Sequence, residues 1–230
     1  QAKGYHTSIA GKWHQAYPAD NEKLWPDKRG FDRSFCILQG GAGHFDDMQP
    51  MFSFYKKSLY FEDRGLIDSL PTGFYSSDFY TQKAMEYISE SVEENKLFFS
   101  FITYSAPHWP LQVPVEYIDL YQGRYDEGYE VLAAERVAQG KKLGILPENT
   151  PAQEITPNVM PWKELNADEK ARASRTMEVY AAMVERLDAN VGKIMEHLAS
   201  RGQKDNTLII FLSDNGAEGN NIDNIVDTGD

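Results

Sequence analysis

The chain has 230 residues, of which 41% are hydrophobic and 25% are charged, a balance that is typical of a folded globular protein and not of a disordered one. Its formal net charge of −12 disfavours a nucleic acid as a partner, because an acidic surface repels phosphate groups. No apolar run reaches the roughly 18 residues that a membrane-spanning helix needs, and the single cysteine, Cys36, excludes an internal disulfide and any metal site built on several cysteines.

The first half of the chain predicts strands separated by a loop, a hairpin and a helix. Residues 5–10 form a short β-prone run, and the polar residues 15–30, broken by prolines, predict a loop. Two aromatic-rich runs within residues 51–63 favour a hairpin. A capped, periodic segment predicts a helix over residues 77–92, and the almost wholly apolar residues 97–104 predict a central strand.

The second half predicts a long helix followed by another buried strand. Residues 115–142 favour two helical pieces, and the proline-rich residues 144–162 favour a long loop. Asn166 can cap the next helix, with Glu169 placed for a return bond, and Gly202 can end it. Residues 207–213 then predict a strand. The apolar positions of the long helix recur at steps of three and four residues: Met177, Tyr180, Val184, Leu187, Val191, Ile194 and Leu198.

Alternating strands and helices predict an α/β fold with a mostly parallel sheet flanked by helices. Ligands of such sheets bind beyond the carboxyl ends of the strands. Polar clusters follow three of the predicted strands at those ends: Lys12-Trp13-His14, Pro107-His108-Trp109 and Asp214-Asn215. The topology therefore predicts that two imidazoles, an ammonium group, a carboxylate and an amide meet at one edge.

Asp214 and Asn215 offer oxygen ligands of the kind that Ca²⁺ or Mg²⁺ prefers. Two ligands do not complete a site, so others would have to come from elsewhere. The alternative is that Asp-Asn-Gly is an ordinary turn at the end of a strand.

Lys12 and His14 are two residues apart, and on an extended segment both side chains point the same way. Such a pair suits an anionic substrate, since the lysine neutralises charge and the histidine transfers a proton near neutral pH. His108 lies between prolines and beside a tryptophan, a setting that favours a fixed side chain. The alternatives are an accidental surface pair and a histidine hydrogen-bonded within a loop.

The remaining histidines and Cys36 carry weaker signals. His6 and His197 are interpreted as structural, and Cys36 as a buried apolar side chain. His44, at the end of a glycine-rich run, is predicted to line a cleft.

Several segments of the sequence resemble those of sulfatases. The run from Gly4 to His14 resembles the second sulfatase signature. Three further segments follow in the order expected of arylsulfatases: Gly30-Phe31-Asp32, Ala106–Pro110 and Ser213–Glu218. Two more, Tyr125–Tyr129 and Met183–Asp188, are also similar to segments of bacterial arylsulfatases. This resemblance implies the α/β fold of the alkaline phosphatase superfamily.

The resemblance also implies that the chain is part of a larger enzyme. The nucleophile of that family is a formylglycine made from Cys or Ser in a Cys/Ser-x-Pro-x-Arg motif, which this sequence lacks. An early Asp-Asp pair and a second lysine are also absent. The chain begins at Gln1 without a recognisable leader, so we expect residues 1–230 to be the central part of a sulfatase catalytic domain.

By the same resemblance, Lys12 is expected to contact the sulfate and the aldehyde hydrate, and His14 to act on that hydrate as a base. His108 is expected near the leaving oxygen, and Asp214 and Asn215 are expected to complete a Ca²⁺ site. The implied partners are a sulfate ester or sulfated glycan and, for the full-length protein, a formylglycine-generating enzyme. Family members are often periplasmic, secreted or lysosomal, which favours export over the cytoplasm.

Two other functions are open on the sequence alone. The same edge of the sheet could hold phosphate in a phosphonate or phosphodiester hydrolase of the superfamily. The chain by itself could also be catalytically inert.

Overall fold

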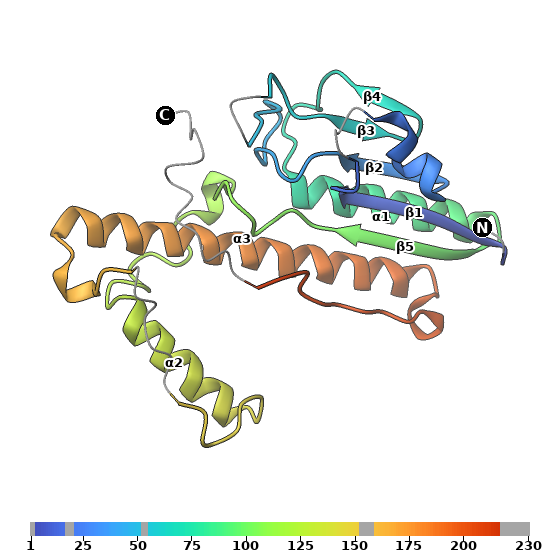
Figure 1. Cartoon of the computed structure of the whole chain (residues 1–230). Coiled ribbons are helices and arrows are strands. Elements are labelled where there is room, and N and C mark those ends of the chain that lie inside the picture. The colour runs from blue at the N-terminus through green and yellow to red at the C-terminus, as the bar shows by residue number, and fades with distance from the viewer. Residues whose placement is uncertain (1–2, 17–20, 52–54, 152–158, 217–230) are drawn as a thin grey trace. The chain divides into compact units, whose positions relative to one another are not determined.

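Figure 1 shows the computed structural model of the chain, which describes residues 3–16, 21–51, 55–151 and 159–216. The chain divides into two compact units. The first comprises residues 1–112 and 184–230, and the second comprises residues 113–183.

The first unit is built on a five-stranded mixed sheet with the order β4-β3-β2-β1-β5. The three strands β2, β1 and β5 are parallel, and β3 and β4 add an antiparallel hairpin. The sequence predicts a hairpin within residues 51–63, whereas the observed hairpin covers residues 60–67. Its two strands are joined by a tight turn at Asp63, whose φ is +53°. The strands are β1 (Tyr5–Lys12), β2 (Arg33–Ile37), β3 (Tyr60–Glu62), β4 (Gly65–Ile67) and β5 (Leu97–Thr103).

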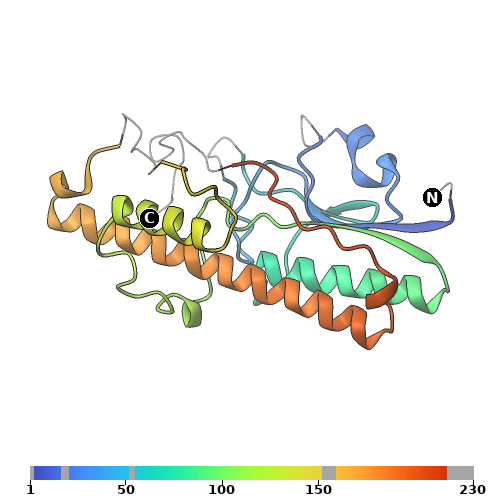
Figure 2. The ribbon, with the colours of Figure 1, turned by 90° about the horizontal axis from the view of Figure 1, so that it is seen from below.

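One face of this sheet is covered by helix α1 (Ser76–Glu93) and the C-terminal part of helix α3 (Ala167–Ser200), as Figures 1 and 2 show. The helices appear where the sequence predicts them. Burying each large apolar side chain of this core stabilises the fold by roughly 2 kcal/mol. The core joins side chains of the sheet and both helices: Phe35, Ile37, Tyr60, Tyr80, Ala84, Tyr87, Ile88, Ile194 and Leu198.

The opposite face carries a smaller cluster that includes Trp25, Cys36 and Phe61. It lies under two short 3₁₀ turns, Glu22–Leu24 and Pro26–Arg29, within the segment that the sequence predicts to be a loop. Cys36 is fully buried, as predicted, and burial raises the pKa of its thiol.

The long helix α3 begins and ends at the predicted signals. The backbone N–H of Asn166 donates to the Glu169 carboxylate at 2.8 Å, and the Glu169 N–H donates to the Asn166 side-chain oxygen at 3.0 Å. This reciprocal pair is a capping box. Gly202, with a φ of +66°, takes the left-handed conformation that follows the C-terminus of a helix.

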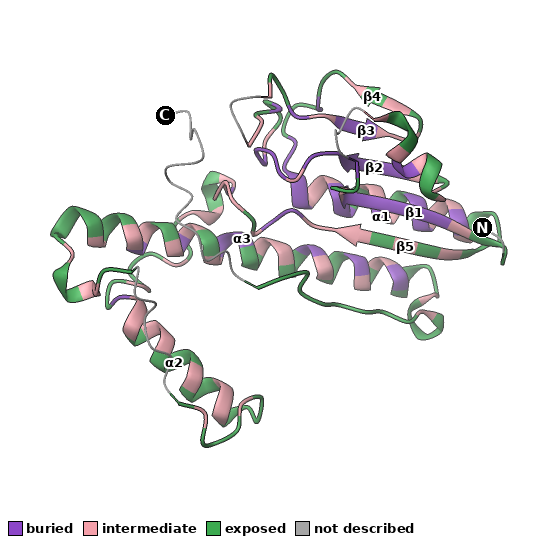
Figure 3. Ribbon diagram, viewed as in Figure 1, coloured by how far each residue is buried: buried purple, intermediate pink, exposed green. Residues whose placement is uncertain are grey.

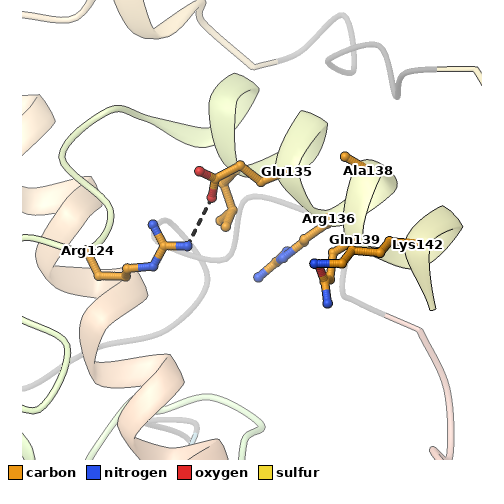
Figure 4. A pocket seen from close by; sticks show the side chains of 7 residues that line it. Arg124, Glu135, Arg136, Ala138, Gln139 and Lys142 are labelled. Carbon is orange, nitrogen blue, oxygen red and sulfur yellow. Dashed lines mark hydrogen bonds and ion pairs between the residues drawn. The ribbon is translucent and has the colours of Figure 1, made fainter.

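The second unit contains helix α2 (Tyr129–Lys142) and loops held by the first part of α3. Of the two helical pieces predicted over residues 115–142, the second is confirmed and the first is a single 3₁₀ turn followed by irregular turns. One side of α2 borders a shallow groove of about 530 Å³ (Figure 4). The Arg124 guanidinium, which lines it, pairs with the Glu135 carboxylate at 3.1 Å.

Two predictions about strands are wrong for the described part of the chain. β5 is an edge strand there and not a central one, and three of its apolar side chains, Leu97, Phe99 and Phe101, are 55%, 52% and 46% exposed (Figure 3). The segment 207–213 forms no strand, and Leu208 is 86% exposed. A strand requires a hydrogen-bonded neighbour, and the described residues place none beside the outer edge of β5 or beside this segment.

No helix within the described ranges is both long enough and apolar enough to cross a membrane.

Candidate active site

Lys12 stands at the carboxyl end of β1, where three parallel strands are tied together. The Thr103 hydroxyl of β5 donates to the Lys12 carbonyl oxygen at 2.7 Å, and the Trp13 N–H donates to the Ile37 carbonyl oxygen of β2 at 2.8 Å. Gly11, with a φ of +132°, allows this close approach, because a Cβ atom there would lie 1.9 Å from the Thr103 carbonyl oxygen. The strand ends therefore fix the position of the Lys12 backbone.

Trp13 anchors the segment between the two predicted catalytic residues of this motif. Its indole N–H donates to the Leu24 carbonyl oxygen at 2.8 Å, and its ring packs edge-on against Phe31 with centroids 5.8 Å apart. His14 follows with a φ of +49°, an uncommon conformation for a residue with a side chain. Gly40 leaves room for it, since a Cβ atom at Gly40 would lie 2.7 Å from His14 Nε2.

His108 lies in the loop that follows β5. Its backbone N–H donates to the Ser105 carbonyl oxygen at 2.9 Å. Its exposed ring donates Nδ1–H to the Trp109 carbonyl oxygen at 2.7 Å, because a carbonyl oxygen can only accept. This bond leaves Nε2 as the nitrogen through which His108 can meet a ligand.

Asp214 and Asn215 lie at a bend after the extended segment 207–213, and both are exposed. The Asn215 amide donates to the Gly216 carbonyl oxygen at 2.7 Å, and the Ser213 hydroxyl donates to the Asn215 carbonyl oxygen at 2.8 Å. These local bonds give the bend a defined form without a strand before it.

Lys12 and His14, at the end of β1, both interact electrostatically with Asp214, and His14 also interacts with His108. Burial lowers the pKa of Lys12, and the nearby Asp214 carboxylate opposes that change. The pKa of His14 is lowered by partial burial first, then by Lys12 and His108, while Asp214 opposes the change. The structure thus brings together Lys12, His14, His108 and Asp214, which the sequence separates by up to 202 positions, from 12 to 214.

This arrangement suits an anionic substrate. An ammonium group can neutralise anionic oxygens, and near pH 7 an imidazole accepts a proton in its neutral form and donates one in its protonated form. The lowered pKa of His14 favours its neutral form, which is the form that can take up a proton.

The described residues contain no group of three or more His, Cys, Asp or Glu side chains that could hold a metal ion. Asp214 and Asn215 nevertheless offer a carboxylate and an amide oxygen, donors that suit a hard cation such as Ca²⁺. They fit one side of such a site and do not complete it.

Other histidines are placed with structural partners. His6 Nδ1 lies 2.7 Å from the Ser91 hydroxyl, and His197 Nε2 lies 3.0 Å from the Ser89 hydroxyl, both within the first unit. The sequence predicts that His44 lines a cleft, but the structure buries it, with only 1% of the residue exposed. Instead it contacts the loop of His108, a relationship for which the sequence near His44 gives no signal beyond its run of glycines.

The sequence of the whole chain is similar to those of sulfatases. The family model described as Sulfatase matches residues 1–225. The chain is 42% identical over 226 residues to an uncharacterized sulfatase of Schizosaccharomyces pombe, covering 95% of this chain and 40% of that protein. It is 36% identical over 214 residues to an arylsulfatase of Klebsiella aerogenes, covering 93% of this chain and 45% of that protein. The chain therefore spans less than half the length of these curated relatives.

Solved structures show the same fold. A structure determined in complex with its substrate D-glucosamine-2-N,6-O-disulfate covers 90% of this chain at a TM-score of 0.54, with 17% identity and 46% of that chain aligned. Other solved structures align at similar TM-scores. The predicted α/β fold resembling alkaline phosphatase is thereby confirmed, as is the resemblance to sulfatases.

Proposed function

The chain belongs to the sulfatase family, and we propose that it supplies one part of the active site of an arylsulfatase-type enzyme that hydrolyses sulfate monoesters. The observation that carries this proposal is the electrostatic interaction of His14 with Lys12, His108 and Asp214, at the ends of β1 and β5. Each of these residues lies in a segment that resembles a sulfatase motif.

Residues 1–230 are proposed to form the central part of a larger catalytic domain. The match to 40% and 45% of the length of two relatives supports this proposal. A formylglycine supplied outside these residues, and made by a formylglycine-generating enzyme, would be the nucleophile, because this sequence contains no Cys/Ser-x-Pro-x-Arg motif.

Lys12 and His108 act at opposite ends of the bond that breaks. The Lys12 ammonium group neutralises the non-bridging oxygens of the sulfate, whose negative charge shifts in the transition state. His108, in its doubly protonated form with Nδ1–H held by the Trp109 carbonyl oxygen, delivers its Nε2 proton to the bridging oxygen as the sulfur–oxygen bond of the ester breaks, and is left neutral. His14, held neutral, would accept a hydroxyl proton from the nucleophile that is supplied outside these residues, as sulfate is released.

Asp214 and Asn215 would hold a Ca²⁺ ion from one side, with the remaining ligands outside the described residues. The ion would supply further positive charge to the sulfate oxygens.

A sulfated sugar or an aryl sulfate is the proposed substrate class. The structure solved with D-glucosamine-2-N,6-O-disulfate supports a sulfated sugar, since it shares the fold over 90% of this chain. Export to the periplasm or the medium is proposed over a cytoplasmic location.

The test measures hydrolysis of 4-nitrophenyl sulfate by the full-length protein. We expect Lys12→Ala and His108→Ala each to lower kcat/KM by about 100-fold or more, because each removes a charge or proton donor used in the transition state. Lys96→Ala is the matched control, since that exposed lysine pairs with Glu94 on the surface and should leave the rate unchanged.

Undiminished turnover in both variants would overturn these roles. A large preference for the matched phosphate ester over the sulfate ester would instead favour a phosphoryl hydrolase of the same superfamily.

A further inference from the structure

His44 is a buried imidazole that the proposed chemistry does not use. It is 1% exposed, and it lies between the N-terminal end of α1 and the loop that carries His108. A polar side chain buried this deeply is costly unless its hydrogen bonds are satisfied, so its partners indicate what it does.

The two ring nitrogens of His44 have different partners. Nε2 lies 3.2 Å from the His108 carbonyl oxygen, and Nδ1 lies 2.7 Å from the Ser76 hydroxyl. A carbonyl oxygen only accepts, so Nε2 carries the proton and donates it, while Nδ1 accepts from the hydroxyl. Burial lowers the pKa of His44 to about 4, which keeps the ring neutral with the single proton that this pattern requires.

The backbone of His44 is fixed as well as its ring. The Ser76 N–H donates to the His44 carbonyl oxygen at 2.9 Å, so these two residues are joined twice. The His44 N–H donates to the Gln112 side-chain oxygen at 2.7 Å, and the Tyr75 hydroxyl donates to the Gln112 carbonyl oxygen at 3.1 Å. The loop after β5 is therefore held at two positions: His44 binds residue 108, and His44 and Tyr75 bind residue 112.

The ring of His108 has little else to orient it. It is exposed, and within the described part of the chain it bonds to the adjacent Trp109 carbonyl oxygen at 2.7 Å. The direction of that ring consequently follows the backbone of residues 108 and 109, and His44 Nε2 is bonded to that backbone.

We propose that His44 is a positioning residue, which aims the His108 imidazole at the leaving oxygen by holding the His108 carbonyl. This inference rests on the proposed function, because it requires His108 to assist the leaving group. It predicts a specific kinetic defect when the bond is lost: esters with poor leaving groups, which need most help from a proton, should suffer most.

The experiment compares His44→Asn with His44→Gln in the full-length protein, on aryl sulfates whose phenols span a range of pKa values. The glutamine amide can reach the position of Nε2 and donate to the His108 carbonyl, whereas the asparagine amide is one methylene too short. We expect the asparagine variant to lose about tenfold in kcat on the poorest leaving group and little on the best, so that the plot of log kcat against phenol pKa becomes steeper. The glutamine variant should keep the wild-type slope.

His6→Asn is the matched control. His6 makes a histidine–serine bond of the same 2.7 Å length, to Ser91, at the other end of β1. Its loss should lower stability without changing the slope. If the His44→Asn protein does not fold, Ser76→Ala takes its place with the same expected steepening, since it removes the hydroxyl that holds Nδ1.

The outcomes separate this inference from the function on which it rests. If His108→Ala does not itself steepen the plot, the role of His108 in the proposed function is wrong. If His108→Ala steepens it but the two His44 variants share one slope, the positioning role of His44 is wrong.

Discussion

The neutral form of His44 makes the stability of the first unit depend on pH. The pKa of His44 is lowered to about 4 by burial, whereas in the unfolded chain it lies near 6.5. Above pH 6.5 the His44 ring is neutral in both the folded and the unfolded state, so its full contribution to the free energy of unfolding is present. As the pH falls from about 6.5 to about 4, the unfolded state binds a proton that the folded state does not, and stability is lost.

We therefore expect the free energy of unfolding of the wild type to fall, relative to His44→Gln, by up to about 1.4 kcal/mol per pH unit between pH 6 and pH 4.5. Urea denaturation of the two full-length proteins at several pH values checks this. Parallel stability curves would show that His44 does not titrate between these states.

Single residues also mark the limit of sequence-based reasoning about the site. Lys12, His14 and His108 were predictable as neighbours, because they follow β1 and β5, parallel strands whose carboxyl ends share one edge of the sheet. Asp214 interacts with Lys12 and His14 although the strand predicted before it does not form. His44 was not, because its position beneath the His108 loop depends on where the chain runs between β2 and α1.

At the scale of elements, Asp78 joins α1 to α3 by charge-assisted hydrogen bonds. Its carboxylate accepts from the Arg186 guanidinium, with the Nε bond at 2.8 Å, and from the fully buried Asn190 amide at 2.7 Å. Removing the carboxylate would leave a partly buried cation and a buried amide without this partner.

We expect Asp78→Ala to lower the free energy of unfolding by about 3 kcal/mol. Glu94→Ala should shift the denaturant midpoint far less, since the Glu94–Lys96 pair is exposed at the surface. Urea denaturation midpoints of both variants test this prediction. Equal shifts would contradict the claim that Asp78 stabilises the contact between α1 and α3 more than an exposed surface pair does.

Elements with local signals were predictable, and those defined by distant partners were less so. Helix α3 has a capping box, a helical period and a terminal glycine within its own sequence, and all three were read correctly. Whether β5 lies at the edge or in the centre of the sheet depends on which segments pair with it, and the apolar sequence of a strand does not predict its neighbours. The same reason explains the segment 207–213, whose composition is that of a strand.

At the scale of the whole molecule, the 230-residue chain by itself is expected to be inactive. The described residues provide only Asp214 and Asn215 toward a cation and no candidate nucleophile of the formylglycine type. We expect the isolated chain to show no turnover of 4-nitrophenyl sulfate above buffer, and calorimetry to show Ca²⁺ binding weaker than about 1 mM. Turnover within tenfold of the full-length protein would contradict the proposed division of the active site.

The uncovered aromatic row on β5 has a consequence for anyone who prepares this chain. Phe99 and Phe101 stack with centroids 6.5 Å apart on β5, which is the edge strand of the described sheet. Such an edge is a template for cross-strand adhesion between molecules. We therefore expect the purified chain to aggregate through β5. Low protein concentration, low temperature and low salt should reduce this aggregation, because cooling weakens the hydrophobic effect and excluded salts strengthen it.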